Sequence, residues 1–591
     1  MKKKILILII VFACCSKGIS QPDTNLYQTT TSQNVATWLK NLPLPTGAGH
    51  ISVLDPQMGA LLISPNGRNY VNNNSMAAYY LSGILFNTDL NLAGQELRSD
   101  FRNMQRAGVF MARSPTLMPW GVIEPTQGSS YHYEFVDSTV KIAGIYGVPI
   151  VGTVLPYADW SQTCNPVNSN CPLFIQGDFF FLNNNKTGPI CSADTTYFYQ
   201  FVQNLVERYD GDGVNDMPGL TLPITIWEFG NEPETPCGQY SATTYSTDQN
   251  IFKRAMKSAC PSCKLINGGY AGFLPDSVFW NDVILNSYAD LDIGNIHSNN
   301  GRNKYPFSFT NMLYGQAQVF QQQINQLSLN WNIWMTEWGI YCGSPGGSLP
   351  TRTEEEQASL YTKLYCWSAA NNITNYFYDL KGLNDSIGGS SALIQIQGPP
   401  NDTLAARLFF YTQKLYEYKF RDYDSVKVVQ FDTSTAFATG DIRFYKSGNT
   451  HYVLWGLSSL PPGLSGVRNM TDIYGNVTTQ NVSSLTLPLG SKPIIIEDTL
   501  VTISVNELSL QNKFSVYPNP FSVETTLKIN RNFKNATLTV YNSFGQAVKQ
   551  IDNLAGQTII FNRDNLPSGL HFIRLTQENK VIATDKIIIT D

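Results

Sequence analysis

Two short segments contain the residues best suited to chemistry, because each brings a glutamate to the end of an apolar run. Residues 224–233 read ITIWEFGNEP and include Glu232, and residues 331–339 read WNIWMTEWG and include Glu337. Apolar residues on both alternating faces are typical of a strand covered on two sides in a parallel sheet. Two carboxylic acids brought to one cleft can cleave a glycosidic bond, one protonating the leaving oxygen while the other attacks or stabilises the sugar cation.

The spacing of the two glutamates predicts the fold that positions them. Glu232 and Glu337 are 105 residues apart, and an eightfold barrel of about 250 residues uses roughly 31 residues for each strand and helix. The interval corresponds to about three such units. Three units around an eight-stranded ring place the two side chains across the barrel mouth from each other.

The central part of the chain alternates between helical and buried-strand patterns. We predict helices at residues 97–106, 135–146, 197–209, 354–370 and 405–416, and strands at 107–113, 148–155, 264–268, 291–297 and 374–380. This alternation is typical of a parallel α/β architecture. We therefore predict a (β/α)8 TIM barrel over residues 72–418.

A different pattern follows the barrel, with short alternating runs at residues 426–431, 442–445, 451–456 and 492–497. Such runs are typical of antiparallel strands, so we predict an accessory β-sandwich at residues 419–500. Residues 471–476 and 487–490 fit its hairpin turns. The N-terminal segment, residues 21–71, is expected to contribute strands to this sandwich, chiefly from 51–71.

The first twenty residues have the pattern of a secretory signal peptide. Lys2, Lys3 and Lys4 precede an apolar run at 5–13, and small residues at 18 and 20 fit a cleavage site. A lipoprotein box at residues 11–14 is the alternative. No later apolar run approaches the roughly 20 residues that a spanning helix needs, so we expect a soluble mature protein without a stable membrane span.

Composition excludes some partners and suggests others. Without residues 1–20 the chain has 36 basic and 45 acidic residues, and this negative balance disfavours nucleic acid and anionic membranes as partners. Aromatic residues make up 12% of the chain, and their faces can stack on sugar rings, although ordinary packing accounts for most of them.

Eight cysteines remain after the leader, an even number that suggests disulfides in an exported protein. Cys164, Cys171 and Cys191 lie in one long polar insertion. Cys260 and Cys263 resemble a metal clip only superficially, since no second cysteine or histidine pair accompanies them. Cys366 is predicted to be a buried free thiol in a helix.

The two glutamate motifs, WEFGNEP at 227–233 and TEWG at 336–339, resemble those of the clan A glycoside hydrolases. The resemblance implies retention of configuration, with Glu232 as acid/base and Glu337 as nucleophile, and no cofactor. It also implies that Asn231 hydrogen-bonds the sugar 2-hydroxyl. Glu232 must then have a raised pKa, which we expect the nearby charge of Glu337 to cause. Within the clan, family 39 and related members carry a sandwich beside the barrel.

Two further polar residues end predicted strands. Arg113, at the end of the second strand, matches the clan's arginine that holds the nucleophile ionised; the alternative is a surface salt bridge. His297 ends the sixth strand, where the clan often has a His-x-Tyr pair. Here the sequence departs from the clan, because residues 297–299 read HSN. Tyr305 or another loop residue could supply the missing hydroxyl, and His297 has either a sugar-binding or a structural role.

Other candidates for substrate binding are aromatic. Trp160 and Trp338 are candidate sugar platforms, with a place in the core as the alternative. Tyr378 and Lys381, at the exit of the eighth strand, are weaker candidates.

Residues 210–216 read DGDGVND, with acidic side chains at Asp210, Asp212 and Asp216. The segment resembles part of a calcium loop, but Val214 occupies a ligand position and the glutamate at the twelfth position is missing. A structural calcium or a polar turn are the two interpretations, and we predict no other metal. Because the segment precedes the fourth strand, it lies at the end of the barrel away from chemistry.

The last part of the chain, residues 506–591, alternates apolar and polar residues between turn signals, which predicts a small antiparallel all-β domain. It resembles the C-terminal type A sorting domain of the Bacteroidetes type IX secretion system at PNPF (518–521), YNSFGQ (541–546) and LPSGLHFIRL (566–575). A sugar-binding or adhesive module is the alternative. The resemblance implies the type IX machinery as a partner, and a secreted or cell-surface location reached through the periplasm and outer membrane.

Taken together, these features predict a secreted retaining glycosidase that hydrolyses O-glycosyl bonds of β-linked polysaccharides or oligosaccharides. The alternative is a non-catalytic carbohydrate-binding or adhesive surface protein on a barrel scaffold. The presence of both glutamates and Asn231 favours the enzyme.

Overall fold

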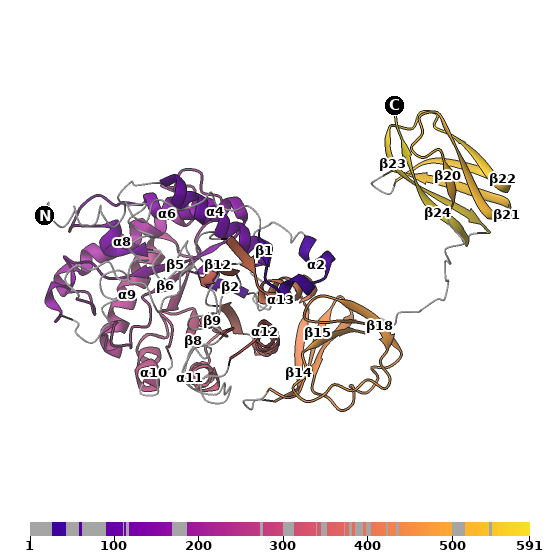
Figure 1. Cartoon of the computed structure of the whole chain (residues 1–591). Coiled ribbons are helices and arrows are strands. Elements are labelled where there is room, and N and C mark those ends of the chain that lie inside the picture. The colour runs from indigo at the N-terminus through magenta and orange to yellow at the C-terminus, as the bar shows by residue number, and fades with distance from the viewer. Residues whose placement is uncertain are drawn as a thin grey trace. The chain divides into compact units, whose positions relative to one another are not determined.

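The chain divides into two structural units, Met1–Val501 and Thr502–Asp591. The computed structural model (Figure 1) describes residues 26–42, 58–61, 90–109, 111–113, 118–167, 186–271, 276–298, 313–338, 340–343, 351–371, 373–377, 381–383, 394–397, 403–420, 423–432, 437–498, 514–542, 546–578 and 580–591. The predicted signal peptide, residues 1–20, lies outside this range, as do Cys171, Tyr305 and Tyr378.

Eight parallel strands form a closed ring at the centre of the first unit. Each strand pairs with the next, and the ring closes because the first strand pairs with both the second and the eighth. In ring order they are β2 (Met58–Leu61), β3 (Ala112–Arg113), β5 (Ile150–Leu155), β6 (Ile226–Phe229), β7 (Lys264–Asn267), β8 (Ile293–Ser298), β9 (Asn332–Trp338) and β10 (Ile373–Phe377). A short strand, β4 (Met118–Pro119), pairs with β5 beside the ring.

A helix follows each ring strand along the chain. These are α4 (Leu90–Ala107), α6 (Glu134–Tyr146), α8 (Thr195–Tyr209), α9 (Ala242–Ala259), α10 (Asp276–Ser287), α11 (Leu313–Gln326), α12 (Glu354–Ala370) and α13 (Leu408–Phe420). The arrangement confirms the predicted (β/α)8 barrel. Shorter elements are α2 (Thr37–Asn41), α5 (Trp120–Ile123) and the 3-10 turns Ser32–Asn34, Gln162–Cys164 and Ser192–Asp194.

Local sequence explains where several helices begin and end. Ser241 and Thr353 each form a reciprocal capping box at the start of α9 and α12, which satisfies backbone donors that the first turn leaves unpaired. Gly147 ends α6 in the left-handed conformation, with φ of 67°. The last helix begins later than predicted, because residues 405 and 406 complete strand β13 (Thr403–Ala406).

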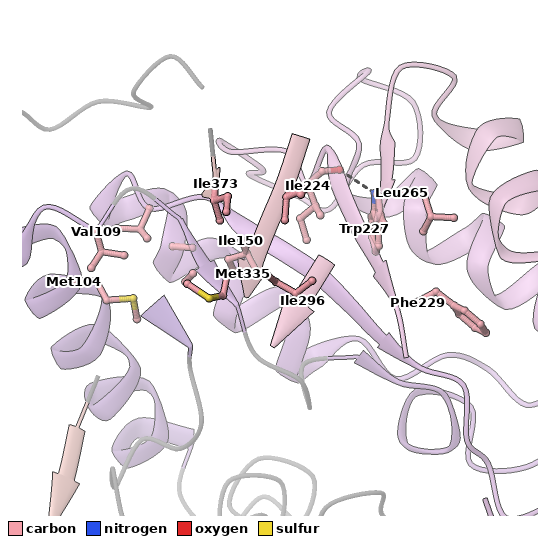
Figure 2. Close-up of a cluster of buried hydrophobic side chains, with 14 of the residues drawn as sticks. Met104, Val109, Ile150, Ile224, Trp227, Phe229, Leu265, Ile296, Met335 and Ile373 are labelled. Atoms are coloured by element: carbon pink, nitrogen blue, oxygen red, sulfur yellow. Dashed lines mark hydrogen bonds between the residues drawn. The ribbon is translucent and has the colours of Figure 1, made fainter. Parts of the chain in front are cut away.

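Alternation along the ring strands separates two apolar layers. The outer layer packs against the helices and includes Trp227, Phe229 and Met335 (Figure 2). A separate cluster comes from six ring positions and fills the interior: Met111, Val151, Ile226, Ile266, Ile293 and Trp334. The barrel interior below the site is therefore a packed apolar plug.

A separate four-stranded sheet has the strand order β1 (Tyr27–Gln28), β13, β12 (Ile394–Gln397) and β11 (Lys381–Leu383). Strand β1 pairs with β13 in parallel, and Ser32 donates a hydrogen bond to the carbonyl of Ala406 at 2.7 Å. The N-terminal segment is thus anchored to the end of the barrel chain.

The accessory β domain is confirmed, and its described strands belong to one six-stranded antiparallel sheet. Their order is β14 (Ser425–Phe431), β15 (Gly440–Lys446), β16 (Asn449–Trp455), β19 (Ile494–Glu497), β17 (Val467–Thr471) and β18 (Val477–Asn481). Alternate residues of β16 join different cores: Val453 and Trp455 join the barrel core, whereas Tyr452 and Leu454 face a separate small cluster. Phe444 of β15 stacks on Phe420 of α13 with ring centres 4.1 Å apart.

The N-terminal segment differs from the expectation that residues 51–71 would add strands to the accessory domain. The described part of that range is β2, which pairs with β10 and β3 as the first ring strand. The physical reason is closure of the barrel. Without β2 the ring would have seven strands, and the eighth strand between β10 and β3 would be missing.

Disulfides link Cys164 to Cys191 and Cys260 to Cys263, and Cys237 is also disulfide-bonded. Cys366 is a buried free thiol, as predicted. Cys260 and Cys263 close the turn between α9 and β7.

The second unit is all-β. Its strands are β20 (Ser515–Tyr517), β21 (Glu524–Tyr541), β22 (Ala547–Asn562), β23 (Gly569–Gln577) and β24 (Lys580–Ile589). Strand β21 pairs with β20, β22 and β23, and β23 pairs with β24, all antiparallel. The unit has its own buried cluster, which includes Leu527, Leu538, Phe561 and Ile587.

Candidate active site

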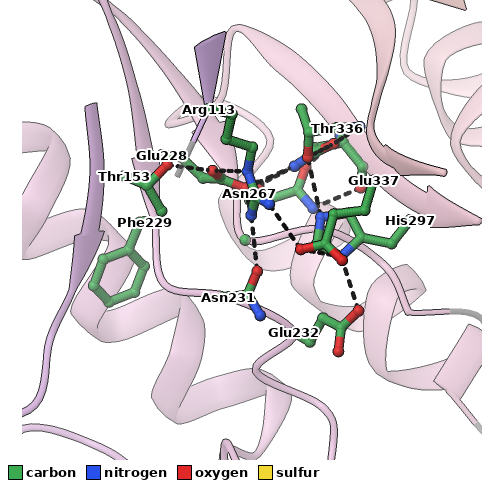
Figure 3. A network of polar contacts seen from close by, with 12 residues as sticks. Arg113, Thr153, Glu228, Phe229, Asn231, Glu232, Asn267, His297, Thr336 and Glu337 are labelled. Carbon is green, nitrogen blue, oxygen red and sulfur yellow. Dashed lines mark hydrogen bonds and ion pairs between the residues drawn. The ribbon is translucent and has the colours of Figure 1, made fainter. Parts of the chain in front are cut away.

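Strand β6 and the turn after it bring two acidic residues to the barrel mouth. Ile226 and Glu228 face the interior, whereas Phe229 points away from the polar network (Figure 3). Gly230 and Glu232 then adopt positive φ angles of 76° and 45°. Such a conformation is uncommon for a non-glycine residue and is often found at functional sites. The Glu232 amide donates to the carbonyl of Gly268 at 2.6 Å, which ties the turn to the end of β7.

Strand β9 delivers Glu337 through a β-bulge. Both neighbouring strands show a register shift here, with one extra residue in β9 between Met335 and the end of the strand. Met335 packs in the outer core, yet Thr336 and Glu337 both bond to groups inside the ring. Strict alternation would turn Glu337 toward the helices. The bulge therefore re-aims its carboxylate into the barrel mouth.

Arg113 joins the acidic residues at the centre of the site. Its Nη1 donates to Glu337 Oε1 at 2.8 Å, and its Nε and Nη2 hold both oxygens of Glu228 at 2.5 and 2.8 Å. Nη2 also donates to Asn231 Oδ1 at 2.8 Å. The residue is 0% exposed, so it is a buried charge with two carboxylate partners and the surface salt bridge does not apply.

Glu228 is a site residue that the sequence analysis did not single out. Besides Arg113, its carboxylate accepts hydrogen bonds from Thr153 at 2.8 Å and Asn295 at 2.9 Å. A fully buried carboxylate persists only when it is paired and hydrogen-bonded in this way. An acidic residue inside an apolar strand was the signal that could have identified it.

His297, at the end of β8, bridges the two predicted catalytic residues. Its Nδ1 lies 2.9 Å from Glu232 Oε1 and 3.8 Å from Glu337 Oε1. One ligand atom from each of these three residues lies within 4.8 Å of the others. Atoms this close could also hold a cation, but the Arg113 guanidinium next to Glu337 opposes one electrostatically.

Burial controls the protonation of both groups. Burial raises the pKa of Glu232 to about 7, against an opposing effect of Arg113. Desolvation, rather than the charge of Glu337 that we expected, is thus the main cause. Burial also lowers the pKa of His297 to about 4. Near neutral pH the site therefore combines a carboxylic acid close to its midpoint with a neutral imidazole.

Two neighbours hold this arrangement in place. The Tyr245 hydroxyl donates to the carbonyl of Phe229 at 2.8 Å and accepts from the amide of Gly268 at 2.9 Å, which clamps the ends of β6 and β7 together. Gly269 lies against the imidazole, where an added Cβ would approach His297 Nε2 to 2.0 Å. Any side chain there would displace the histidine.

Of the further candidates for sugar binding, only Trp160 has a side chain that the structure describes. Trp160 is partly buried after β5, donates its indole hydrogen to the carbonyl of Glu124 at 2.8 Å, and packs edge-on against Trp120 and Tyr197. The Trp338 backbone ends β9, but its side chain lies outside the described set, as do Tyr378 and the side chain of Lys381. Their roles stay predictions.

The acidic turn at Asp210, Asp212 and Asp216 follows α8, at the opposite end of the strands. Its carboxylates accept hydrogen bonds from the backbone amides of residues 211–214 at 2.7–3.3 Å. Oxygens of the three residues lie within 4.8 Å of one another. Both a polar turn and a calcium site stay open at this position.

Comparisons with known proteins identify the C-terminal unit. Residues 515–590 match the family model of the secretion system C-terminal sorting domain. The predicted sorting domain is confirmed, and it indicates export to a secreted or cell-surface location. Within the described residues, no helix has the length and apolar character needed to span a membrane.

For the first unit the comparisons yield similar solved structures. One is a family 39 glycoside hydrolase from the gut symbiont Bacteroides cellulosilyticus WH2, with 14% identity over 76% of this chain and 81% of that chain and a TM-score of 0.46. The second is a glucosidase from Croceicoccus marinus, with 12% identity over 87% of this chain and 95% of that chain and a TM-score of 0.45. The third is AbfB, a family 51 α-L-arabinofuranosidase from Bifidobacterium longum, with 11% identity over 76% of this chain and 98% of that chain and a TM-score of 0.44. No curated protein sequence matches the chain. With these TM-scores, the fold assignment rests on the strand pairing above.

Proposed function

We propose that the barrel is a retaining glycoside hydrolase that cleaves β-linked polysaccharides or oligosaccharides. The observation that carries this proposal is the close approach of two carboxyl groups that have different partners, Arg113 for Glu337 and His297 for Glu232. Glu232 and Glu337 offer oxygens within 4.8 Å of each other, close to the separation of about 5 to 5.5 Å in retaining enzymes and below the 6.5 Å or more in inverting ones.

In the first step Glu337 attacks the anomeric carbon and Glu232 gives its proton to the departing oxygen. Arg113 donates to Glu337 Oε1 at 2.8 Å and orients this carboxylate for the attack. Because Asn231 Oδ1 accepts from Arg113, the amide hydrogens of Asn231 remain for the sugar 2-hydroxyl. That bond strengthens as positive charge develops on the sugar.

In the second step Glu232 takes a proton from water, and the water displaces Glu337 from the sugar. The proton that Glu232 lost in the first step is thus restored, and the anomeric configuration is retained. Glu232 suits both steps because its pKa of about 7 lies near a working pH around neutral. Trp160, Trp338 and Tyr378 are proposed contacts for the sugar rings around this centre.

A substrate panel with product analysis tests the proposal. The mature protein is incubated with plant, algal and microbial polysaccharides and with β-glycosides, and products are identified. An NMR time course should show the β anomer first. Early α product would contradict retention, and binding without any hydrolysis across the panel would favour the carbohydrate-binding alternative.

We further propose the type IX secretion machinery as the partner of the C-terminal domain. Deleting residues 506–591 should leave hydrolysis per molecule nearly unchanged, because the catalytic unit has its own core. The truncated protein should accumulate in the periplasm of the native host. Full-length levels at the surface or in the medium would contradict this, and weaker polysaccharide binding with normal export would indicate a sugar-binding module.

A further inference from the structure

The side-chain amide of Asn295 has one fixed orientation inside the barrel. Its Oδ1 accepts from the backbone amide of Thr336 at 3.2 Å, and a backbone N–H can only donate. Its Nδ2 donates to Glu228 at 2.9 Å and to the carbonyl of Asn267 at 3.0 Å. A flipped amide would place hydrogens against the amide of Thr336, so Oδ1 is an acceptor.

This orientation determines where the Thr336 hydroxyl points. Thr336 Oγ1 lies 2.9 Å from Asn295 Oδ1 and 3.0 Å from His297 Nε2. A hydroxyl has one hydrogen, and the two oxygens at 2.9 Å need it between them. Thr336 therefore donates to Asn295 and accepts from His297, which places the imidazole hydrogen on Nε2.

With its hydrogen on Nε2, the neutral imidazole presents a lone pair at Nδ1. Glu232 Oε1 lies 2.9 Å from that atom, and this contact is a hydrogen bond only if Glu232 supplies the proton. We infer that Asn295 and Thr336 fix the tautomer of His297, and that His297 in turn holds Glu232 in its protonated form before catalysis. This inference deepens the proposed function and rests on it for its catalytic meaning.

Packing keeps the imidazole in this orientation. The ring is fully buried, and Gly269 leaves no room beside Nε2. Among the described residues, the titratable and charged groups that face His297 are Glu232, Glu337, Arg113 and Glu228, and those that face Glu232 are His297, Glu337, Arg113 and Glu234. Burial keeps the imidazole neutral among them, so the ring acts through the position of its hydrogen rather than through charge.

The contact between His297 Nδ1 and Glu232 influences both displacement steps, although His297 itself neither gains nor loses a proton. When Glu232 has given its proton to the leaving oxygen, the Nδ1 lone pair faces a carboxylate at hydrogen-bond distance. That repulsion raises the affinity of Glu232 for the next proton, which comes from the attacking water. His297 is thus a positioning residue for the acid/base, because it neither gains nor loses a proton overall.

Nitrogen NMR of the full-length protein tests the tautomer without any substrate. The chain has five histidines, and the signal that disappears in His297→Gln assigns His297. Near pH 6 we expect a protonated Nε2 and an unprotonated Nδ1 that accepts a hydrogen bond. A protonated Nδ1 in the wild type would overturn the inference, even if hydrolysis follows the proposed mechanism.

A matched pair of variants tests the link to the acid/base. Thr336→Val removes the acceptor for Nε2–H and lets the hydrogen move to Nδ1, where it stabilises the carboxylate of Glu232. The basic limb of kcat/KM against pH should then shift down by roughly half to one pH unit. Thr336→Ser keeps the hydroxyl and should keep both the limb and the NMR signature.

An unshifted limb in Thr336→Val, with the tautomer changed, would refute the effect on Glu232. If the wild type hydrolysed no substrate, the proposed function would be refuted, but the inference that Asn295 and Thr336 fix the tautomer of His297 would still stand on the NMR result.

Discussion

Two groups of ionisable side chains in the first unit each bring their ligand atoms within 4.8 Å of one another, but the groups have different partners. At the barrel mouth, Glu337 is buried and Glu232 is partly buried beside the fully buried side chains of Arg113 and His297. At the far end of the strands, the aspartates of the 210–216 turn accept hydrogen bonds from backbone amides; Asp212 is exposed, and Asp210 and Asp216 are partly exposed. Close carboxylates alone therefore do not define a reactive centre. Burial raises the pKa of Asp210 in the turn to about 6 and that of Glu232 at the mouth to about 7, so desolvation acts at both places. The mouth differs because a fixed cation, Arg113, lies against Glu337 and an imidazole lies against Glu232, whereas backbone amides are the partners of the acids at the turn.

The largest expected effect is at the mouth. Glu337→Gln should lower turnover by about 10^4-fold or more, because the first step loses its nucleophile and the amide cannot replace it. The amide keeps the shape of the side chain, so circular dichroism and substrate binding should change little. Asp212→Asn, in the exposed turn, is the control and should retain wild-type turnover. Near-normal turnover of Glu337→Gln would refute the assignment.

Glu232→Ala should have a smaller and substrate-dependent effect. Loss of general acid catalysis typically costs about 10^2- to 10^4-fold, and substrates with activated leaving groups should suffer least because they need little protonation. Azide should restore part of the rate on activated substrates by replacing the activated water. Equal damage on both substrate types, without rescue, would count against Glu232 as the acid/base.

Protonation should link activity and stability at Glu232. The acid must carry its proton, so kcat/KM should fall as pH rises through about 7. The folded pKa lies above the ordinary glutamate value of 4.5, so the folded state binds this proton more tightly than the unfolded one. The wild type should therefore lose up to about 3 kcal/mol of unfolding free energy between about pH 4.5 and pH 7.

Glu232→Gln isolates this contribution, because an amide does not titrate. Its unfolding free energy relative to the wild type, measured by denaturant titration, should rise with pH through that window. A difference that stays constant from pH 4 to pH 8 would contradict the raised pKa.

The smallest effect is expected at the exposed turn. Asp216→Ala removes the acceptor for the amides of Gly211 and Gly213 and should cost about 1 kcal/mol of stability, with kcat unchanged. Asp216→Asn keeps an oxygen acceptor and should cost less. If calcium raises the Tm of the wild type but not of Asp216→Ala, the turn is a metal site and the comparison between the two clusters needs revision.

Sequence patterns located the strand ends well, because burial and turn chemistry are local. The structure brings Arg113, Asn231, Glu232, His297 and Glu337 together at one mouth. Parallel strands present their carboxyl ends at the same edge, so residues predicted to end separate strands converge once the barrel closes.

The polar layer beneath these residues was missed for a physical reason. Glu228, Asn295 and Thr336 lie within strands, where periodicity predicts which face a residue occupies but not which partner it meets across the ring. Asn295, a fully buried amide between Gly294 and Ile296 in β8, was a visible signal. The position of β2 in the barrel was not predicted either. Its four residues, MGAL, fit a strand of the barrel or a strand of the accessory domain, and only closure of the barrel selects the first.

Because β9 has one extra residue before Glu337, the direction of this side chain depends on the number of residues in the strand as well as on the residue type. If the one extra residue were deleted and all other residues were kept, the same glutamate would point to the outside of the barrel and face the helices instead of the sugar. Anyone transferring this site to an idealised barrel must therefore copy the irregular strand along with the acids, since a regular scaffold with both glutamates would hold only half of the reactive pair.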